Sequence, residues 1–295
     1  MDQPTILDQE IKTAGPEDPE YPLALKKIKN PPKTLYYLGR MLAEEDCLAV
    51  VGSRFASPYG KAAALELAKG AVQNGLTIVS GLAVGIDSCA HKAAVQLGRR
   101  TIAVLGGGLD IGSFYPRENI RLAQEILDSG GALISEYPPG TKPARYTFPQ
   151  RNRVIAGLVL GVLVVEAKLR SGALLTADWA KKYNKKIFAV PGPIHNANSQ
   201  GCNRLIKNGA MLAEDHNDIL KGLHMSSASL RQQALPIQDP NEQAILKVLE
   251  QENFNIEKII EMAKIDAATA ARTIILLEMK GAIIDLGGGV YGLAR

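Results

Sequence analysis

Cations alternate with aromatic rings between residues 135 and 153, directly before a strongly apolar run. These side chains are Lys142, Arg145, Arg151 and Arg153, interleaved with Tyr137, Tyr146 and Phe148. A guanidinium beside a ring suits a strand of phosphates that carries bases, because the cation pairs with phosphate and the ring stacks on a base. Single-stranded nucleic acid is therefore the first candidate ligand. A solvated basic loop is the alternative, since cations beside aromatics are common on protein surfaces.

A second candidate phosphate site, Gly52-Ser53-Arg54, follows the apolar run 47–51 and precedes a helical pattern. It offers backbone N–H groups, a hydroxyl and a guanidinium, and both helix N-termini and arginines favour phosphate. The turn is not a Walker A loop, because the next Gly-Lys pair is too far along the chain and Ala62 follows it in place of Ser or Thr. No G-x-G-x-x-G follows either, so ATP and nicotinamide are disfavoured and no cofactor is expected. A plain strand-to-helix corner is the alternative.

The titratable side chains show no catalytic arrangement. Asp87 and His91, at i and i+4 of a predicted helix, share a face, but no nucleophile is spaced to join them. A capping aspartate and a packed histidine are therefore predicted. Glu166, at the end of a predicted strand, could be a base, a ribose ligand or a structural acceptor for N–H groups of the turn at Ser171-Gly172, and the structural role is favoured beside the nearby cations.

Length, composition and charge describe a globular protein of more than one domain. The 295 residues exceed the usual single-domain size, and 46% hydrophobic with 22% charged residues can bury a core. The net charge of +4 is uneven, because residues 241–295 carry eight acids against six bases, which leaves +6 on the first 240 residues. Attraction for phosphate therefore belongs to the N-terminal part.

Cysteine usage and hydropathy favour a cytoplasmic protein. The three cysteines form no CxxC motif and have no histidine at ligand spacing, so neither a disulfide framework nor a metal site is expected. The apolar run 154–165 is shorter than the about 20 residues that cross a bilayer. The polar, Pro-rich N-terminus lacks the apolar core of a signal peptide. We expect no membrane segment.

From residue 47 the sequence repeats one unit, a short apolar run, a glycine-bearing turn and a helical pattern. The runs are 47–51, 76–79, 101–105, 132–135, 162–167 and 186–190. Strands that are apolar on both faces, alternating with amphipathic helices, predict a parallel sheet covered on both sides. The predicted fold class is α/β, with a Rossmann-like parallel sheet. Ligands of such sheets bind outside the carboxyl ends of the strands, where the glycine turns lie.

A different pattern follows the last of these units. Three short helical segments, with Asn255 and Asp266 as N-caps and Gly281 as a stop, precede a hairpin predicted to turn at Gly287–Gly289. Three helices closed by a hairpin are typical of a winged-helix domain. The predicted parts are an N-terminal extension that packs on the core (1–42), a Rossmann-like DNA-binding domain (43–223), a linker (224–240) and a winged-helix domain (241–295).

The chain carries several specific motifs in one order: YPLAL, PPKTLYYLG, GSRFASPYG, SGLAVGIDSCAH, FYPRENIRL, FPQRNRVIAGL, VVEA with SGALLTA, AVPG and GCNRLIKNGA. In this combination the chain resembles the DNA-processing protein A family, DprA, also called Smf. The resemblance covers about residues 21–223 and, more loosely, 241–295. It implies a non-catalytic protein that binds and protects incoming single-stranded DNA, forms a homodimer through its Rossmann-like domain, and loads the RecA recombinase during natural transformation.

The resemblance also assigns binding residues by position. It places a phosphate-gripping arginine on Arg54, pocket residues on Arg145 and Phe148, and the family's RNR run at 151–153. The DNA-binding residues expected together are Gly52, Ser53, Arg54, Lys142, Arg145, Phe148, Arg151, Asn152, Arg153, Ser171, Gly172 and Thr176. Many members carry an N-terminal helical domain, for which the about 45 residues before the first predicted strand are too few. The resemblance therefore leaves open the contacts that other members make through that domain.

Two other functional classes fit parts of the sequence. A related Rossmann-like family hydrolyses nucleoside monophosphates with a PGGxGT turn and a catalytic glutamate, but LGGGLD at 105–110 and AKLRSGALLT at 167–176 do not reproduce that turn. A transcription factor would read duplex DNA through the winged helix. Its predicted recognition helix at 267–279 holds one arginine within an acidic domain, so protein contact is favoured for that domain.

Overall fold

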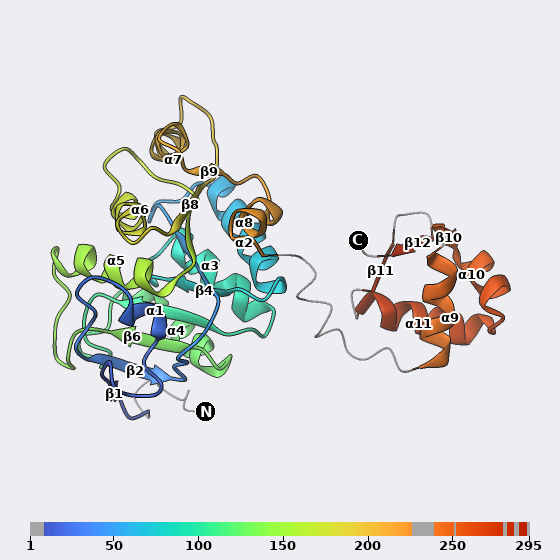
Figure 1. Cartoon of the computed structure of the whole chain (residues 1–295), viewed down its shortest axis with the longest axis horizontal. Coiled ribbons are helices and arrows are strands. Elements are labelled where there is room, and N and C mark those ends of the chain that lie inside the picture. Colours follow the sequence, from blue (N-terminus) through green and yellow to red (C-terminus); the bar gives the residue numbers. More distant parts are fainter. Residues whose placement is uncertain (1–8, 226–238, 251, 280–281, 286–288, 294–295) are drawn as a thin grey trace. The chain divides into compact units, whose positions relative to one another are not determined.

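The structure is a computed structural model of the chain and describes residues 9–225, 239–250, 252–279, 282–285 and 289–293. The chain divides into two compact units, Met1–Ser227 and Ala228–Arg295. Each unit has its own apolar core, and Figure 1 labels the helices and strands of both units.

Within the described residues, the large unit is built on one nine-stranded sheet in the order β1-β2-β6-β5-β4-β3-β7-β8-β9. Every pairing from β6 through β9 is parallel. The Rossmann-like sheet predicted from the apolar runs is therefore confirmed. The strands are β1 (Lys12–Ala14), β2 (Leu35–Gly39), β3 (Cys47–Val51), β4 (Thr77–Ser80), β5 (Thr101–Leu105), β6 (Ala132–Ser135), β7 (Gly161–Val164), β8 (Lys186–Ala189) and β9 (Met211–Leu212).

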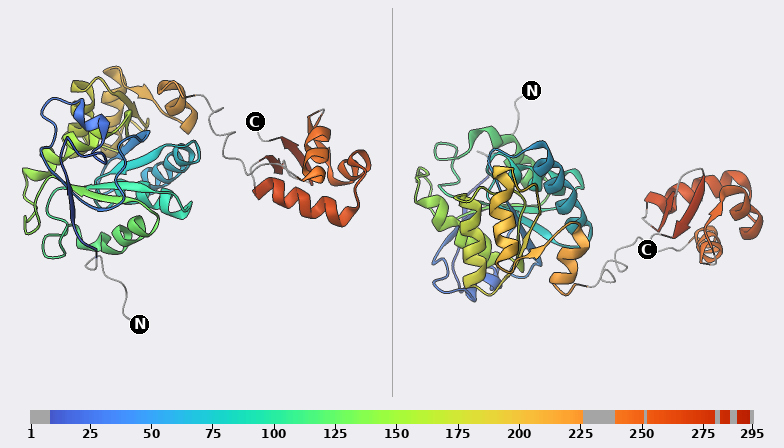
Figure 2. Two further views of the ribbon diagram at one scale, coloured as in Figure 1. Left: turned by 60° about the horizontal axis from the view of Figure 1, so that its bottom comes forward. Right: turned by 90° about the horizontal axis from the view of Figure 1, so that it is seen from above.

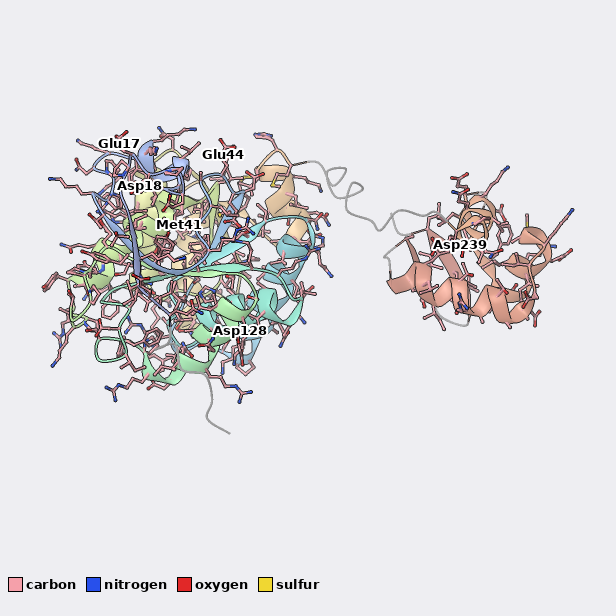
Figure 3. The ribbon with its side chains drawn as sticks, turned by 90° about the horizontal axis from the view of Figure 1, so that it is seen from below. Glu17, Asp18, Met41, Glu44, Asp128 and Asp239 are labelled. Atoms are coloured by element: carbon pink, nitrogen blue, oxygen red, sulfur yellow. The ribbon has the colours of Figure 1, made fainter. Side chains whose placement is uncertain are left out.

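The N-terminal segment adds two strands that were not expected from the sequence. β2 pairs antiparallel with β6, and β1 pairs antiparallel with β2 at the outer edge. Between them, α1 (Leu23–Lys26) buries Leu25 fully, and the buried Tyr21 hydroxyl donates a hydrogen bond of 2.8 Å to the carbonyl of Pro32. Figure 3, which labels Asp18 and Met41, shows this segment along the outside of the large unit.

Helices cover both faces of the sheet (Figure 2). Successive residues of the central strands point to opposite faces, so Ala49 joins one core cluster and Leu48 and Val50 join the other. No helix among the described residues is long and apolar enough to cross a bilayer. One face carries α2 (Pro58–Gln73), α3 (Ile86–Gln96), α4 (Ile120–Asp128), which follows the 3-10 turn η2 (Arg117–Asn119), and α8 (His216–Gly222); the other carries α1, α5 (Thr147–Leu158), α6 (Gly172–Lys182) and α7 (Ala197–Lys207).

The order of the strands reverses between β3 and β7. The chain first moves outward through β4, β5 and β6, then returns through α5, so that β7 pairs with the free side of β3. In open α/β sheets a ligand crevice lies at such a reversal, outside the carboxyl ends of the strands. Residues that follow β3 and residues that follow β7 therefore meet at one edge of the sheet.

The small unit is a winged helix, as predicted. The cap predictions are confirmed: Asn255 Oδ1 accepts from the Lys258 N–H at 2.9 Å, and Asp266 Oδ1 accepts from the Thr269 N–H at 3.0 Å. The predicted stop at Gly281 and the turn residues 287–288 lie outside the described residues. The elements are α9 (Pro240–Leu249), β10 (Phe254–Asn255), α10 (Ile256–Ala263), α11 (Ala267–Met279) and the hairpin strands β11 (Ile283–Asp285) and β12 (Val290–Leu293), in the sheet order β10-β12-β11.

Candidate nucleic-acid interface

A cavity of about 430 Å³ opens at the carboxyl ends of β3 and β7. It is bounded by the turn after β3, the first half of α5 and the segment that joins β7 to α6. Nine of the twelve residues predicted to bind DNA line it: Gly52, Ser53, Arg54, Phe148, Arg151, Asn152, Ser171, Gly172 and Thr176. The reversal of strand order brings these three sequence segments together.

Close backbone packing shapes the turn after β3. A Cβ on Gly52 would lie 2.6 Å from the Ile86 side chain, and a Cβ on Gly85 would lie 2.3 Å from the carbonyl oxygen of Ser53. Gly85 also has a φ of +89°, which favours glycine. Only glycine fits at both positions, so the turn at 52–54 rests directly on the start of α3. The helix that follows this turn, α2, begins only at Pro58, so Arg54 lies outside its first turn.

Glu166 anchors the rest of this turn. Glu166 is 1% exposed, and its carboxylate accepts hydrogen bonds from the Ser57 N–H at 2.9 Å and the Ser57 hydroxyl at 2.5 Å. The predicted structural role is confirmed, but the predicted partner, the Ser171-Gly172 turn, is wrong. The reason is topological, since Glu166 follows β7 and β7 lies beside β3, which puts the carboxylate against the β3 turn.

Arg54 and Phe148 lie together at the mouth of the cavity. The Arg54 side chain is exposed, and its guanidinium carbon is 5.0 Å from the centroid of the Phe148 ring. Phe148 is half-buried in the first turn of α5, and its ring lies 5.8 Å from the ring of Tyr115. A cation over a ring, both reachable from solvent, is an arrangement that can pair with phosphate and stack on a base.

Arg151 forms the floor of the cavity. It is 6% exposed, its guanidinium donates to the Val104 carbonyl, and a Cβ on Gly81 would lie 2.3 Å from its Nη1. The pKa of Arg151 is lowered to about 10, mainly by burial. The negative charge of Asp87 opposes this shift, and the positive charge of Arg54 adds to it. The chain thus holds a buried positive charge beneath an exposed one.

The N-terminus of α6 forms another wall. Ser171 is its N-cap, with Oγ accepting from the Ala173 N–H at 3.3 Å, and Asn152 Nδ2 donates to the Gly172 carbonyl at 3.2 Å. Thr176, one turn further, is buried. The first turn of a helix carries N–H groups without helical partners and a positive dipole end, both of which favour an anion.

Three predicted binding residues lie outside the cavity lining. Arg153 is part-buried, forms an ion pair with Glu136 and donates to the Asn30 carbonyl at 2.8 Å. Lys142 and Arg145 are exposed on the loop between β6 and α5. The structure does not bring these three cations to the cavity.

Lys168 and Arg170 line the cavity, although the sequence suggested them only as partners for Glu166. Both side chains are exposed. Neither these cations nor Arg54 forms an ion pair with any described residue. Both residues follow the carboxyl end of a predicted strand and precede a predicted helix. Ligand sites of parallel sheets lie at such positions, so this pattern could have predicted them.

His91 is packed and hydrogen-bonded, as predicted, whereas the helix cap predicted for Asp87 is wrong, because the N-cap of α3 is Gly85 and has no side-chain cap. The buried Asp87 carboxylate accepts from the Gly81 N–H at 3.1 Å and the Ala83 N–H at 3.4 Å. His91 is fully buried with Nδ1 2.8 Å from the Thr101 hydroxyl, and burial lowers its pKa to about 3. Burial also raises the pKa of Asp87. Asp87 lines the cavity with its carboxylate held by these two N–H groups, and His91 does not line it.

A mostly parallel sheet covered on both faces, a cation-lined crevice at its strand reversal and a separate winged helix define a Rossmann-like protein with an appended winged-helix domain. The family model for DNA recombination-mediator protein A matches residues 12–224, and the model for the DprA winged helix domain matches residues 229–289. The chain belongs to the DNA recombination-mediator protein A family, DprA or Smf, as its motifs predicted.

The chain is similar to several curated members of this family. It is 40% identical to Protein Smf of Escherichia coli over 98% of this chain and 79% of that protein. It is 46% identical to the DNA processing protein DprA of Streptococcus pneumoniae over 68% of this chain and 70% of that protein. It is also 43% identical to Protein Smf of a Synechocystis strain over 70% of this chain, but spans only 53% of that protein.

Two solved structures have the same fold as the large part of this chain. The X-ray structure of DprA from Streptococcus pneumoniae aligns with a TM-score of 0.67 at 44% identity, covering 72% of this chain and 74% of that one. A DprA structure from Helicobacter pylori, described for its single-stranded DNA binding mode, aligns with a TM-score of 0.65 at 31% identity, covering 75% of this chain and 98% of that one.

Proposed function

We propose that the large unit binds single-stranded DNA in the cavity at the carboxyl ends of β3 and β7. The observation that carries this proposal is the Arg54 guanidinium, 5.0 Å from the Phe148 ring at the cavity mouth. When Arg54 binds a phosphate of the strand, the base of that nucleotide lies within reach of the Phe148 ring. Stacking of a base on an aromatic ring does not depend on which base it is. The Helicobacter pylori relative, described as binding single-stranded DNA, supports the proposal.

The chemistry of the cavity favours single strands over duplex DNA. Its half-buried ring can be reached only by a base that has left the stack of a double helix. Three exposed cations, Arg54, Lys168 and Arg170, surround the opening, and the buried charge of Arg151 lies below. This charge attracts phosphates whatever the sequence of the strand.

In the cell, this activity protects incoming DNA and loads the RecA recombinase onto it during natural transformation and recombination. A homodimer formed through the large unit and a contact with RecA complete the proposal. The support for both is membership of a family of recombination mediators. The winged helix has a protein partner in this scheme, since α11 carries a single arginine.

The side chains that could serve a nucleotide hydrolase as acid or base are held in hydrogen bonds within the protein, although Asp87 lines the cavity. The Glu166 carboxylate is buried against Ser57, and Asp87 and His91 are buried in hydrogen bonds with loop and strand groups. A binding protein without catalysis fits these contacts better than an enzyme does.

The test is fluorescence anisotropy of labelled oligothymidine and of a matched duplex, at one fixed salt concentration, with the full chain. We expect tight binding of the single strand, a large loss in Arg54→Ala and a smaller loss in Lys142→Ala, because a guanidinium fixed on a packed turn is preorganised for bidentate phosphate contact. Arg121→Ala is the control and keeps the parent affinity, because Arg121 is exposed on α4 and does not line the cavity.

Equal losses in Arg54→Ala and Arg121→Ala would contradict the cavity as the binding site. RecA loading is tested separately, by the rate at which RecA forms filaments on single strands already bound by a single-strand binding protein. The parent speeds this reaction, and Arg54→Ala does not. A rate independent of the added protein would refute the loading step.

A further inference from the structure

The Phe55 side chain is 85% exposed and stands at the rim of the cavity, next to Arg54 in the chain. It is the most exposed of the large hydrophobic side chains among the described residues. Burial of an aromatic ring is favourable, so we would expect a mobile loop to pack the ring against the protein. The ring remains exposed, so something must hold it out.

The backbone of this loop is fixed on both sides of the ring. The Phe55 N–H donates to the Ser53 hydroxyl at 3.1 Å, and the Phe55 carbonyl accepts from Asn198 Nδ2 at 3.0 Å. Two residues further, Ser57 is held by two hydrogen bonds to the buried Glu166 carboxylate.

Asn198 is fixed as well. It lies in the first turn of α7, and its carbonyl accepts from the Ala167 N–H at 2.7 Å. The Phe55 backbone is therefore attached to the sheet through β3, β7 and α7 together. A backbone fixed in this way places the ring at the rim of the cavity before any ligand arrives, so less freedom is lost when the ring stacks on a partner.

We propose that Phe55 is a second base-stacking platform, beside the one at Phe148, and this inference rests on the proposed function. Each phosphate of a single strand has a base on either side of it. A phosphate held by Arg54 therefore directs one neighbouring base to the Phe148 ring, 5.0 Å from that guanidinium, and the other to the ring of the next residue in the chain. Two rings around one cation bind a dinucleotide step of any sequence.

The experiment compares the parent with Phe55→Ala, Phe55→Leu and Phe55→Trp in the full chain. The probes are an oligothymidine and an abasic oligonucleotide of the same length, which keeps the phosphates and lacks the bases. Ile194→Ala is the matched control, because Ile194 is 75% exposed in another loop and does not line the cavity. Melting temperatures confirm that all variants fold, as expected for a side chain with little buried area.

We expect Phe55→Ala and Phe55→Leu to weaken oligothymidine binding about 5- to 100-fold. Phe55→Trp and Ile194→Ala keep the parent affinity, and binding of the abasic probe is the same in all variants. In Phe55→Trp, bound oligothymidine quenches the fluorescence of the new indole. This pattern requires a π face at position 55 and bases on the ligand.

Four results would overturn the inference. An unchanged affinity of Phe55→Ala for oligothymidine, while the parent binds it, removes the platform and leaves the proposed function intact. Equal losses on the oligothymidine and abasic probes assign the effect to phosphate contacts. A change of oligomeric state in Phe55→Ala, seen by sedimentation, assigns the ring to a contact between copies of the chain. A parent that binds no single strand refutes the proposed function and this inference with it.

Discussion

Glu166→Gln tests whether the buried carboxylate holds the DNA-binding loop or serves as a base. In the parent, one carboxylate oxygen accepts from the Ser57 N–H at 2.9 Å and the other accepts from the Ser57 hydroxyl at 2.5 Å. Glutamine has nearly the same shape but only one acceptor oxygen, so one of the two donors is left facing an NH₂ group. A hydrogen bond to a charged group contributes about 1.5–3 kcal/mol, and a buried donor without a partner costs a similar amount.

We therefore expect Glu166→Gln to lower the free energy of unfolding of the large unit by about 1.5–3 kcal/mol. For a unit of this size, each kcal/mol corresponds to about 2–4 °C, so the melting temperature falls by about 3–12 °C. The loop that carries Arg54 also loses part of its preorganisation, and affinity for oligothymidine falls about 2- to 10-fold. The assays are urea unfolding and fluorescence anisotropy on the same samples.

Ser57→Ala is the matched partner variant, because it removes the hydroxyl from the same contact. Ser57 is also the N-cap of α2, so this variant loses the cap as well. The two substitutions are in direct contact, and their effects on stability are expected to be non-additive by about 1 kcal/mol or more in a double-mutant cycle. A Glu166→Gln protein as stable as the parent, or more stable, would refute the anchoring role and return the carboxylate to the candidates for a catalytic base.

Three further outcomes follow from the structure. Residues 1–227 alone keep most of the affinity for oligothymidine, because the cavity and the excess positive charge lie there; a loss as large as that of Arg54→Ala, measured by anisotropy, would contradict this. Arg153→Ala lowers the melting temperature, since it breaks the contact with Glu136, while affinity stays near the parent's; a loss of affinity at unchanged stability would place Arg153 on the DNA. The pKa of His91 is about 3 in the folded state against 6.5 in an unfolded chain, so the unfolded chain alone takes up a proton as pH falls below 6.5, and stability declines toward pH 3. Urea unfolding at pH 7.5 and 5.5 measures this dependence of stability on pH, which is expected to be smaller in His91→Gln. The same dependence in the parent and in His91→Gln would contradict the lowered pKa of His91.

The strands of the parallel sheet could be predicted because a strand buried on both faces is apolar at every position. Runs such as 47–51 and 101–105 are apolar throughout, and the structure has β3 and β5 at those positions. Helix ends could be predicted for a similar reason, since Asn255 caps its own helix through a contact three residues away. The edge strand β1 could not be predicted in this way, because only one of its three residues, Ala14, is buried. That β2 joins the sheet antiparallel beside β6, almost a hundred residues further along the chain, is likewise not recorded in the local pattern.

Helical geometry decided which cations of the RNR run reach the cavity. Residues of an α-helix turn about 100° per position, so Arg151 and Asn152 lie within about 60° of Phe148, whereas Arg153 lies about 140° away. The structure agrees, with Arg151 and Asn152 lining the cavity and Arg153 paired with Glu136 on another side of α5. The family resemblance alone, without the helix bounds, treated the three as one group.

The sequence by itself determined the fold class, the family and most of the residues of the cavity, because each depends on short motifs that act through neighbouring positions. Only the tertiary structure decided which distant residues those motifs contact. Glu166 accepts hydrogen bonds from Ser57, more than a hundred residues away, and Lys168 lines the same cavity as Arg54, because β7 returns to pair with β3. A contact of that kind is set by the order of strands in the sheet, which no local pattern along the chain records.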